Sequence, residues 1–317
     1  MSAPEQIKHE KYERLIATAK KMQPPKVAVV HPCDQSSLEG AVDAARLGLI
    51  DPILVGPADR IRQVATEFGL DISAFPIVET EHSHDSAQRA VDLVREGKAE
   101  ALMKGSLHTD ELMSAVVKTD GGLRTSRRLS HCFVMDVPGH PDPLIITDAA
   151  VNIAPTLAEK ADILQNAIDL AHVLRIPEVR VAILAAVEMV NPKMPSTIEA
   201  AALCKMADRG QITGAILDGP LALDNAISPE AATIKHLTSP VAGHANVILV
   251  PDLEAGNMLA KSLTFLANAE AAGIVLGARV PIILTSRADS VPSRLASCAV
   301  ASLIAQSRRV NAGKAVV

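Results

Sequence analysis

The segment from Ile282 to Ser290 joins an apolar run to a cluster of reactive side chains. The run is followed by two hydroxyls, a guanidinium, a carboxylate and a third hydroxyl, carried by Thr285, Ser286, Arg287, Asp289 and Ser290. Ligands collect at the carboxyl ends of strands in open α/β sheets, so this ending predicts a site. Hydroxyl and guanidinium groups suit a phosphate, and a carboxylate suits proton transfer. A helix start with Ser290 as N-cap explains the segment equally well, and both interpretations remain open here.

A second candidate lies between Leu102 and Asp110. Lys104 ends an apolar run, Gly105 permits a tight turn, and Thr109 can cap a following helix. An ammonium group beside a helix N-terminus favours a phosphate or a carboxylate. The alternative is an ordinary strand, turn and helix with a solvated lysine.

A third candidate is the arginine-rich stretch from Asp120 to His131. Three arginines and three hydroxyls precede an apolar run, namely Arg124, Arg127, Arg128, Thr125, Ser126 and Ser130. Guanidinium groups bind phosphate oxygens through two parallel hydrogen bonds. We therefore expect an anion site here, with a salt-bridged surface loop as the alternative.

Two stretches of the C-terminal half, Leu217–Ala226 and Val250–Met258, are interpreted as loops after apolar strands. Their Asp and Asn side chains, Asn257 among them, can position a polar ligand or cap helices, and capping is the better explanation for Asp252. Asp218, Asp252 and Glu254 have no spacing that selects a metal geometry, so no metal is expected.

Several standard sites are missing from the sequence. It contains no nucleotide-binding P-loop, no dinucleotide fingerprint, no zinc-protease motif and no nucleophile elbow. Cys33, Cys132, Cys204 and Cys298 are far apart and form no C-x-x-C pair, which is typical of reduced, packed thiols.

The bulk composition narrows the class of protein. Of 317 residues, 48% are apolar and only 2% aromatic, which disfavours base stacking on single-stranded nucleic acid. The formal charge of −5 gives no general attraction to DNA or anionic membranes. Neither a membrane-spanning run nor a secretory signal is evident, so we expect a cytoplasmic protein with no nucleic-acid or membrane partner.

Short apolar runs alternate with helical patterns along the chain. The expected strands are Val27–Val30, Pro52–Val55, Ala101–Met103, Cys132–Met135, Leu144–Ile146, Val181–Leu184, Ala215–Leu217, Val247–Val250, Gly273–Leu276 and Pro281–Leu284. The expected helices include Ser36–Leu47, Ala58–Phe68, Ser86–Glu96, Leu157–Leu174, Ser196–Ala207 and Pro292–Gln306. This alternation predicts an α/β protein with mainly parallel sheets covered by helices.

One proline-rich segment, Val137–Pro143, breaks the alternation and predicts a turn between strands or a crossover. We expect the change of domain just after it, near Asp148.

Taken together, these segments resemble the phosphate acetyl/butyryl transferase family. The resemblance lies in their order and spacing between residue 26 and about residue 306. The matching stretches are Met103–Thr109, Leu123–Arg124 through Ser130–His131, Phe133–Asp136, Ile146–Ile153, Asp218–Ala226, Val250–Asn257 and Thr285–Ser290.

The resemblance implies a two-domain fold like that of isocitrate and isopropylmalate dehydrogenases, with the active site in an interdomain cleft. Residues 1–147 plus 281–317 would form the first domain and residues 148–280 the second. It also implies a homodimer that interconverts acyl-CoA and inorganic phosphate with acyl phosphate and CoA. CoA is then a substrate, and no bound cofactor or metal is required. Some relatives carry a hydratase-like domain before this module, and its activity is expected to be absent here.

The resemblance also implies roles for the candidate residues. Asp289 would act as the base for the CoA thiol, while Arg287 and Arg128 hold the phosphate and Ser286 bonds to the reacting centre. The phosphate and CoA pocket would be completed by Lys104, Gly105, Thr109, Ser130, Arg124 and Asn257.

This chain departs from the acetyl-specific pattern in two places. Acetyl-specific relatives carry the base several residues farther on, where this chain has Ser293, and an arginine where this chain has Leu112-Met113. The position of Asp289 follows the butyryl-type pattern instead. Two alternatives remain, a metal- and NAD-dependent dehydrogenase of the same fold and a non-catalytic protein that binds acyl-CoA or phosphate.

Overall fold

The computed structural model describes residues 9–285 and 289–314, which divide into two compact units. Unit 1 joins the described residues up to Lys11 to Ser130–Ala271, and unit 2 joins Tyr12–Leu129 to the described chain from Ala272 onward. The boundaries therefore fall earlier than the expected ones after residues 147 and 280. The reason is strand pairing, because the two strands between Ser130 and Thr147 pair with each other, and the second of them pairs with a later strand of unit 1.

Unit 2 is built on a mainly parallel sheet. Its strand order is β3 (Ile77–Glu79), β2 (Asp51–Gly56), β1 (Lys26–Val30), β4 (Ala101–Lys104), β11 (Ile282–Ile283) and β10 (Glu270–Leu276). All neighbours pair in parallel except β10 and β11. The central strands are buried along nearly their whole length, as expected of parallel strands covered on both faces.

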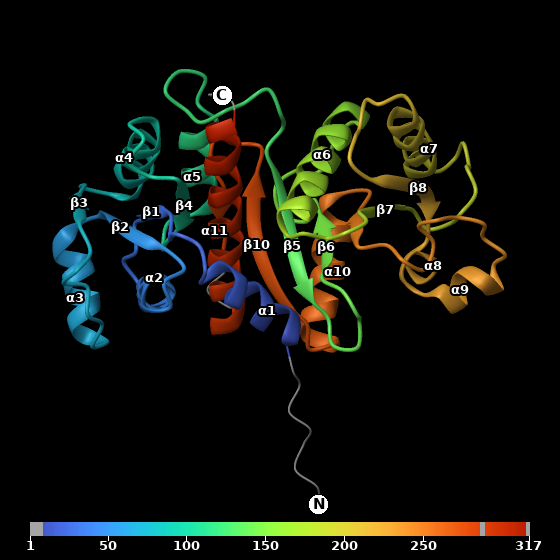
Figure 1. The fold of residues 1–317 in the computed structure, drawn as a ribbon. Coiled ribbons are helices and arrows are strands. Elements are labelled where there is room, and N and C mark those ends of the chain that lie inside the picture. Colours follow the sequence, from blue (N-terminus) through green and yellow to red (C-terminus); the bar gives the residue numbers. More distant parts are fainter. Residues whose placement is uncertain (1–8, 286–288, 315–317) are drawn as a thin grey trace, which may run out of the picture. The chain divides into compact units, whose positions relative to one another are not determined.

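Helices cover both faces of this sheet. In unit 2, α4 (Ser83–Arg95) packs against β1 and β2, while α2 (Gln35–Arg46) packs against β2, α3 (Ala58–Glu67) and α11 (Val291–Lys314) (Figure 1). The remaining helices of this part are α1 (Glu10–Ala19), whose residues from Tyr12 onward belong to unit 2, and α5 (Thr109–Val117), which packs against α4.

Unit 1 has a second set of paired strands. Their order is β5 (Ser130–Asp136), β6 (Leu144–Thr147), β9 (Val247–Leu249), β7 (Arg180–Leu184) and β8 (Ile216–Leu221). The β5–β6 pair is antiparallel and the others are parallel. Residues 137–143 connect β5 to β6, which confirms the turn predicted for this proline-rich segment.

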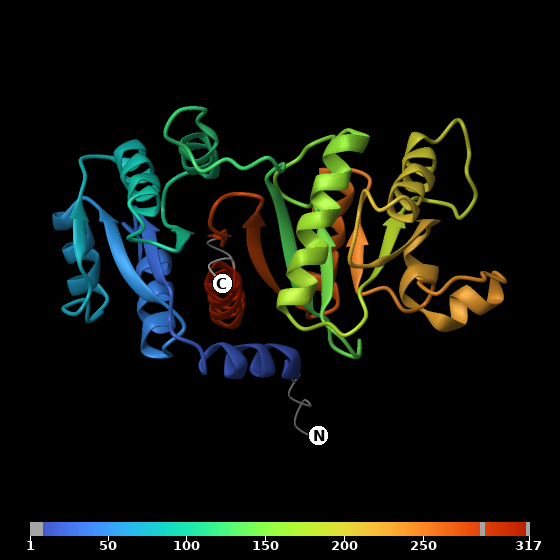
Figure 2. The same ribbon diagram turned by 45° about the horizontal axis from the view of Figure 1, so that its top comes forward.

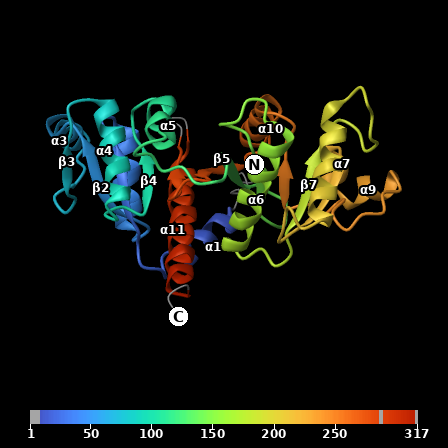
Figure 3. The same cartoon turned by 90° about the horizontal axis from the view of Figure 1, so that it is seen from above.

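The helices of unit 1 pack on these strands. Helix α6 (Leu157–Val173) lies along β5, β6 and β9 (Figure 2), and α7 (Pro195–Asp208) packs against β7 and β8. Helices α7 and α9 (Pro229–Ile234) lie at the β7 end of the unit (Figure 3), where α9 packs against α8 (Leu223–Ile227). Helix α10 (Leu253–Leu266) packs against β6. Among the described residues, no helix has the length and apolar character needed to cross a membrane.

The expected elements compare well with the observed ones, with identifiable exceptions. Every strand and helix named from the sequence overlaps an observed one. Strand β3 was not expected, because its three residues lie at the sheet edge and are only partly buried. The interpretation of Leu217–Ala226 as a loop was wrong, since β8 continues to Leu221 and its pairing with β7 includes Asp218. The interpretation of Val250–Met258 as a loop was also wrong beyond Asp252, because α10 begins at Leu253.

Three helix caps were expected at named residues. Asp252 caps α10 by accepting from the Ala255 main-chain N–H at 2.9 Å, and Ser290 accepts from that of Ser293 at 3.1 Å before α11. Both caps are therefore confirmed. Thr109 was wrong as a cap, because His108 occupies the N-cap position of α5 and Thr109 is its first helical residue.

Candidate functional site

Strand pairing in unit 2 brings two of the candidate segments to one edge of the sheet. Strand β11 runs parallel to β4, with Ile283 opposite Met103. The chain that leaves β11 toward Asp289 therefore starts beside Lys104 and Gly105. Both segments follow the carboxyl ends of their strands, which is where open α/β sheets bind ligands.

Gly105 fixes how closely the end of β4 approaches the end of β1. Its main-chain N–H donates to the Val30 carbonyl at 2.9 Å. A Cβ atom at this position would lie 2.2 Å from that oxygen and 2.6 Å from the His31 carbonyl oxygen. Only glycine fits here, so Gly105 acts through close packing of the main chain rather than by contacting a ligand with a side chain.

The other candidates near this edge are positioned by main-chain elements. Lys104 is half-buried at the end of β4, and Thr109 begins α5. Asp289 is half-buried immediately before the cap residue of α11. Ser286 and Arg287 lie outside the described residues.

Arg294 is a residue that the sequence analysis missed. Its Nη1 donates to the Asp289 carbonyl at 3.0 Å, while its side chain is 8% exposed and lies against Gly40 of α2. Its Nε atom is buried without a hydrogen-bond partner among the described residues. Burying a guanidinium costs free energy unless hydrogen bonds compensate for the lost water. Here the hydrogen bond from Nη1 also holds the main chain at Asp289. No motif marks it, because its role depends on α2 and α11 packing together.

The arginine-rich segment is anchored on the opposite end of β11. Arg124 forms a bridge with Ala278, and Thr125 donates through Oγ1 to the Gly277 carbonyl at 2.6 Å. Gly277 and Ala278 precede β11, so Arg124 and the Lys104 segment lie at opposite ends of that strand. The side chains of Arg124 and Arg128 are exposed.

Two candidates belong to unit 1. Ser130 is fully buried and accepts a hydrogen bond from Nδ2 of Asn166 in α6 at 2.9 Å. Asn257, in the second turn of α10, donates through Nδ2 to the Ala149 carbonyl at 3.2 Å. In unit 1 both therefore stabilise the ends of strands, Ser130 at the start of β5 and Asn257 in the segment that follows β6.

Asp148 organises the segment after β6. Its carboxylate is buried and accepts from the main-chain N–H groups of Ala150 and Val151 at 2.9 and 3.0 Å. It also accepts from the His131 main-chain N–H at 3.1 Å and from Asn152 Nδ2 at 2.6 Å. So many donors satisfy a buried carboxylate without a cation, and they make this segment a rigid part of unit 1.

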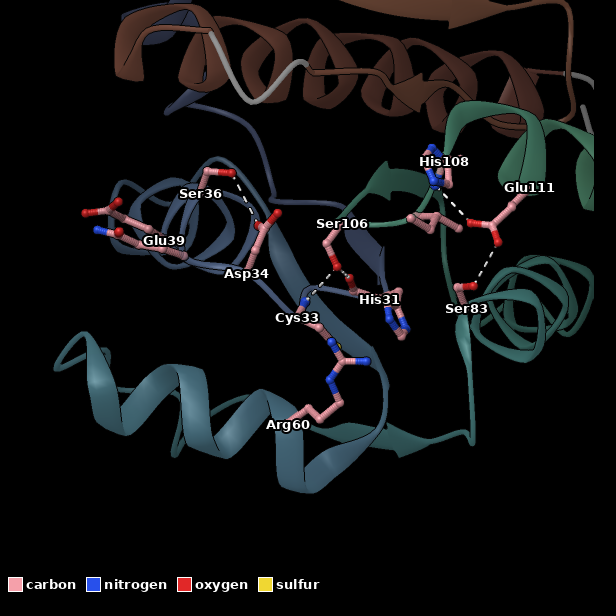
Figure 4. Close-up of a pocket in the computed structure, with 12 residues that line it drawn as sticks. His31, Cys33, Asp34, Ser36, Glu39, Arg60, Ser83, Ser106, His108 and Glu111 are labelled. Carbon is pink, nitrogen blue, oxygen red and sulfur yellow. Dashed lines mark hydrogen bonds between the residues drawn. The ribbon is translucent and has the colours of Figure 1, made fainter.

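A pocket of about 770 Å³ lies at the carboxyl edge of the sheet in unit 2 (Figure 4). Its walls come from the segments that follow β1 and β4, from the first turns of α2, and from one residue each of α3, α4 and α5. They include His31, Cys33, Asp34, Arg60, Ser106 and His108. This pocket could not be predicted from the sequence, because the His31–Ser36 segment carries no recognised motif and Arg60 lies within a helix.

The four cysteines are not suited to act as nucleophiles. Burial raises the pKa of Cys132, Cys204 and Cys298 to about 12, and that of Cys33 is also raised, mainly by burial. Each thiol is therefore protonated at neutral pH, whereas attack requires the thiolate. Nor do the described residues contain a group of three or more His, Cys, Asp or Glu side chains that could hold a metal ion.

Comparison with known proteins identifies the family. A model of the phosphate acetyl/butaryl transferase family matches residues 80–302. The phosphate acetyltransferase of Rhizobium meliloti is 65% identical over 299 residues, which are 94% of this chain and 95% of that protein. The chain belongs to this family, and it is an acyltransferase. The resemblance drawn from the ordered sequence segments is thereby confirmed.

Further relatives agree with this assignment. The phosphate butyryltransferase of Clostridium acetobutylicum is 42% identical over 294 residues, covering 93% of this chain and 98% of that one. The crystal structure of a branched-chain phosphotransacylase from Enterococcus faecalis V583 matches with a TM-score of 0.78 and 31% identity, covering 89% of this chain and 99% of that one.

A dehydrogenase shares the fold alone. The 4-hydroxythreonine-4-phosphate dehydrogenase of Klebsiella pneumoniae matches with a TM-score of 0.54 at 13% identity, covering 89% of this chain and 100% of that one. Together with the phosphotransacylase structure, this match confirms the expected dehydrogenase-like α/β fold class.

We predict that stability depends on pH through His131. Burial lowers the pKa of this histidine from 6.5 to about 4, while the nearby Asp148 partly opposes the shift. Between these pH values the unfolded chain binds a proton that folded His131 does not. The free energy of unfolding should therefore fall by about 3 kcal/mol as the pH drops from 6.5 to 4.

Denaturant unfolding at several pH values measures this slope. His131→Phe should flatten it, because the ring that packs edge-on against Phe133 is kept and the titrating group is removed. His244→Phe, at an exposed histidine, should keep the slope. Equal slopes for the wild-type chain and His131→Phe would refute the prediction.

We predict that Arg294→Met lowers kcat at least tenfold with a smaller effect on KM, because it releases the main chain at Asp289. Arg308→Met is the matched control. Arg308 lies on the same helix and donates to the Ala278 carbonyl at 3.2 Å, before β11 rather than after it. Steady-state kinetics and thermal unfolding of both variants separate the two effects. A similar loss of kcat in Arg308→Met would show that Arg294 acts only by stabilising the fold.

Proposed function

We propose that this chain transfers a short acyl group reversibly between CoA and inorganic phosphate, with acetyl as the preferred group. The observation that carries the preference is the identity of 65% to a phosphate acetyltransferase, against 42% to a phosphate butyryltransferase. The position of Asp289 follows the butyryl-type pattern, so this local feature and the overall identity favour different acyl groups. We give the overall identity more weight, because many positions determine it.

The proposed reaction begins with the thiol of CoA. A thiol with a pKa of about 8.5 is mostly protonated at neutral pH, so a positioned base raises the concentration of thiolate. We assign this role to Asp289. The sulfur attacks the carbonyl carbon of the acyl phosphate, a carbon–sulfur bond forms, and the carbon–oxygen bond to phosphate breaks. The phosphate leaves with the electron pair, and Asp289 returns the proton to it.

The phosphate needs cationic and hydrogen-bonding partners as its charge develops. We propose that Arg128 and Arg287 bind the phosphate and stabilise this charge. Ser286 would form a hydrogen bond to the reacting centre. Lys104, Thr109 and Arg124 of unit 2 are further proposed phosphate- or CoA-binding residues, and Gly105 sets the close main-chain approach at the end of β4. Ser130 and Asn257 support the strand ends of unit 1. The proposal needs no metal ion and no bound cofactor, since every step is a proton transfer or an acyl transfer. We place the reaction in the cytoplasm, where CoA is available.

We predict that the protein releases thiol from acetyl-CoA when phosphate or arsenate is added, faster than from propionyl- or butyryl-CoA. Asp289→Asn should lower kcat about 100-fold, the scale of general-base catalysis. Arg128→Ala should raise KM for phosphate about tenfold, the scale of a charge-assisted hydrogen bond. Thiol release followed spectrophotometrically gives all three results.

The control for the carboxylate is Asp142→Asn, in the exposed turn between β5 and β6. Its kinetics should match the wild type. An active enzyme with an unaffected Asp289→Asn variant would remove Asp289 as the base, and no thiol release from any acyl-CoA would defeat the proposed function.

We also propose that the protein is a homodimer that associates through α10. Three large apolar side chains of this helix, Met258, Phe265 and Leu266, are 62%, 73% and 83% exposed. Met258 and Phe265 are seven residues apart and so lie on one face. Ile153 extends this surface because its carbonyl accepts from the Leu253 main-chain N–H at 3.0 Å and its side chain is 74% exposed. A surface of this kind is typical of an interface between subunits.

We predict that Phe265→Glu lowers the fraction of dimer at micromolar concentration, because it places charge in the apolar contact. Sedimentation velocity measures the change. Ile234→Glu, at an exposed apolar residue of α9, is the control and should leave the dimer intact. A wild-type chain that sediments as a monomer would contradict the proposal.

A further inference from the structure

The pocket in unit 2 lies where the strand order reverses. From β1 the chain proceeds to β2 and β3 on one side, and then returns to β4 on the other side of β1. The segments that follow β1 and β4 therefore diverge at their carboxyl ends, which is the position at which doubly wound sheets bind ligands. Residues of both segments line this pocket, and its volume is suited to a small molecule.

The floor of the pocket is held rigidly. His31 has a positive φ of 56°, which few residues other than glycine adopt. Its carbonyl accepts from the main-chain N–H of Ser106 at 2.9 Å and from Ser106 Oγ at 2.8 Å. The Cys33 main-chain N–H donates to Ser106 Oγ at 3.3 Å (Figure 4). These bonds tie the segment after β1 to the segment after β4.

Arg60 supplies the cation of the pocket. It reaches from α3 toward Cys33 at the end of β1 (Figure 4). It makes no hydrogen bond or ion pair with another residue that the structure describes, and its positive charge contributes to the lowered pKa of His31. Burial is the larger cause of this lowering, and a pKa below the usual 6.5 favours the neutral imidazole at neutral pH. The charge that is available for an anion in the pocket is therefore that of Arg60.

Two of the three carboxylates in the pocket are already bound. Asp34 accepts from the Ser37 main-chain N–H at 2.9 Å and from Ser37 Oγ at 2.6 Å, as the cap of α2. Glu111 accepts from the His108 main-chain N–H at 2.9 Å and from Ser83 Oγ at 2.9 Å. Both carboxylates also lie at the N-terminus of a helix, Asp34 at α2 and Glu111 at α5, where the helix dipole stabilises a negative charge. Glu39 makes no hydrogen bond or ion pair with its side chain among the described residues, so its carboxylate can accept hydrogen bonds from a ligand's hydroxyl or amino groups.

The pocket and the proposed base lie along one edge of the same sheet. Strand β4 separates β1 from β11, and neighbouring strands are about 4.8 Å apart, so the ends of β1 and β11 are about 10 Å apart. A ligand that reaches from the end of β11 into this pocket must span about 10 Å or more, and its far end should carry a phosphate and hydroxyl or amino groups to match Arg60 and Glu39. CoA has this form, since an extended arm separates its thiol from its phosphorylated adenosine.

We propose that this pocket binds the nucleotide end of CoA, with the Arg60 guanidinium on a phosphate and Glu39 on the hydroxyl or amino groups of the adenosine. This inference rests on the proposed acyltransferase function and extends it to substrate recognition. Arg60 is a binding residue in it, remote from the reacting atoms. Inorganic phosphate is the other source of the same chemistry, and the kinetic experiment separates the two.

The test compares Arg60→Ala with Arg62→Ala. Arg62 lies on the same helix, is exposed and pairs with Asp59, but does not line the pocket. Arg60→Ala should raise KM for CoA about tenfold or more, the scale of a lost charge-assisted hydrogen bond. Its kcat/KM for pantetheine, which lacks the nucleotide, should fall no more than in Arg62→Ala. Adenosine 3′,5′-bisphosphate should compete with CoA and bind at least tenfold more weakly to Arg60→Ala in calorimetry.

Each outcome decides the question. An unchanged KM for CoA in Arg60→Ala overturns the inference, as does a raised KM for acyl phosphate alone, which would assign the pocket to inorganic phosphate. An equal loss of kcat/KM with CoA and with pantetheine in Arg60→Ala would also overturn the inference. If the wild-type protein transfers no acyl group, the proposed function fails, while calorimetry with adenosine 3′,5′-bisphosphate still tests the pocket independently.

Discussion

The contact between Gly105 and the end of β1 is the constraint on which the carboxyl edge of unit 2 depends. The main chain of Gly105 bonds to the Val30 carbonyl, and no side chain fits between them. This approach fixes the end of β4 against the end of β1, after which Ser106 bonds to the His31 carbonyl and holds one wall of the pocket. Because β11 pairs with β4 in parallel, the same constraint sets the start of the segment that leads to Asp289.

The two units satisfy their buried or partly buried carboxylates in a similar way. Asp148 in unit 1 receives main-chain donors from its own segment, and Asp34 and Glu111 in unit 2 receive donors at helix starts. These acidic groups therefore need no cation. In unit 2 this leaves the guanidinium of Arg60 with no ion-pair partner among the described residues. An acidic chain can thus present a local positive charge, since potential at a site depends on nearby groups more than on net charge.

Much of the fold could be predicted from the sequence because its strands are buried on both faces. Such strands form continuous apolar runs, and Val27–Val30 and Ala101–Met103 were found for that reason. The short edge strand β3 is only partly buried and has no such apolar run. The second half of β8 was missed because Asp218-Gly219-Pro220 interrupts its apolar run. The unit boundaries could not be located, because the pairing of β5 with β6, and of β6 with β9, is a property of contacts between distant residues.

The order of segments along the chain was enough to predict the fold class, the family and the candidates that follow buried strands, such as Lys104 and Asp289. These features depend on local order along the chain, where an apolar run and its polar ending are adjacent. Which strand ends lie together depends on contacts between distant residues, so the pocket at Arg60 and the support that Arg294 gives to Asp289 are visible only in the folded chain. Both arginines lie on helices and act across packed elements, and the chemistry of a helical arginine is set by what packs opposite it.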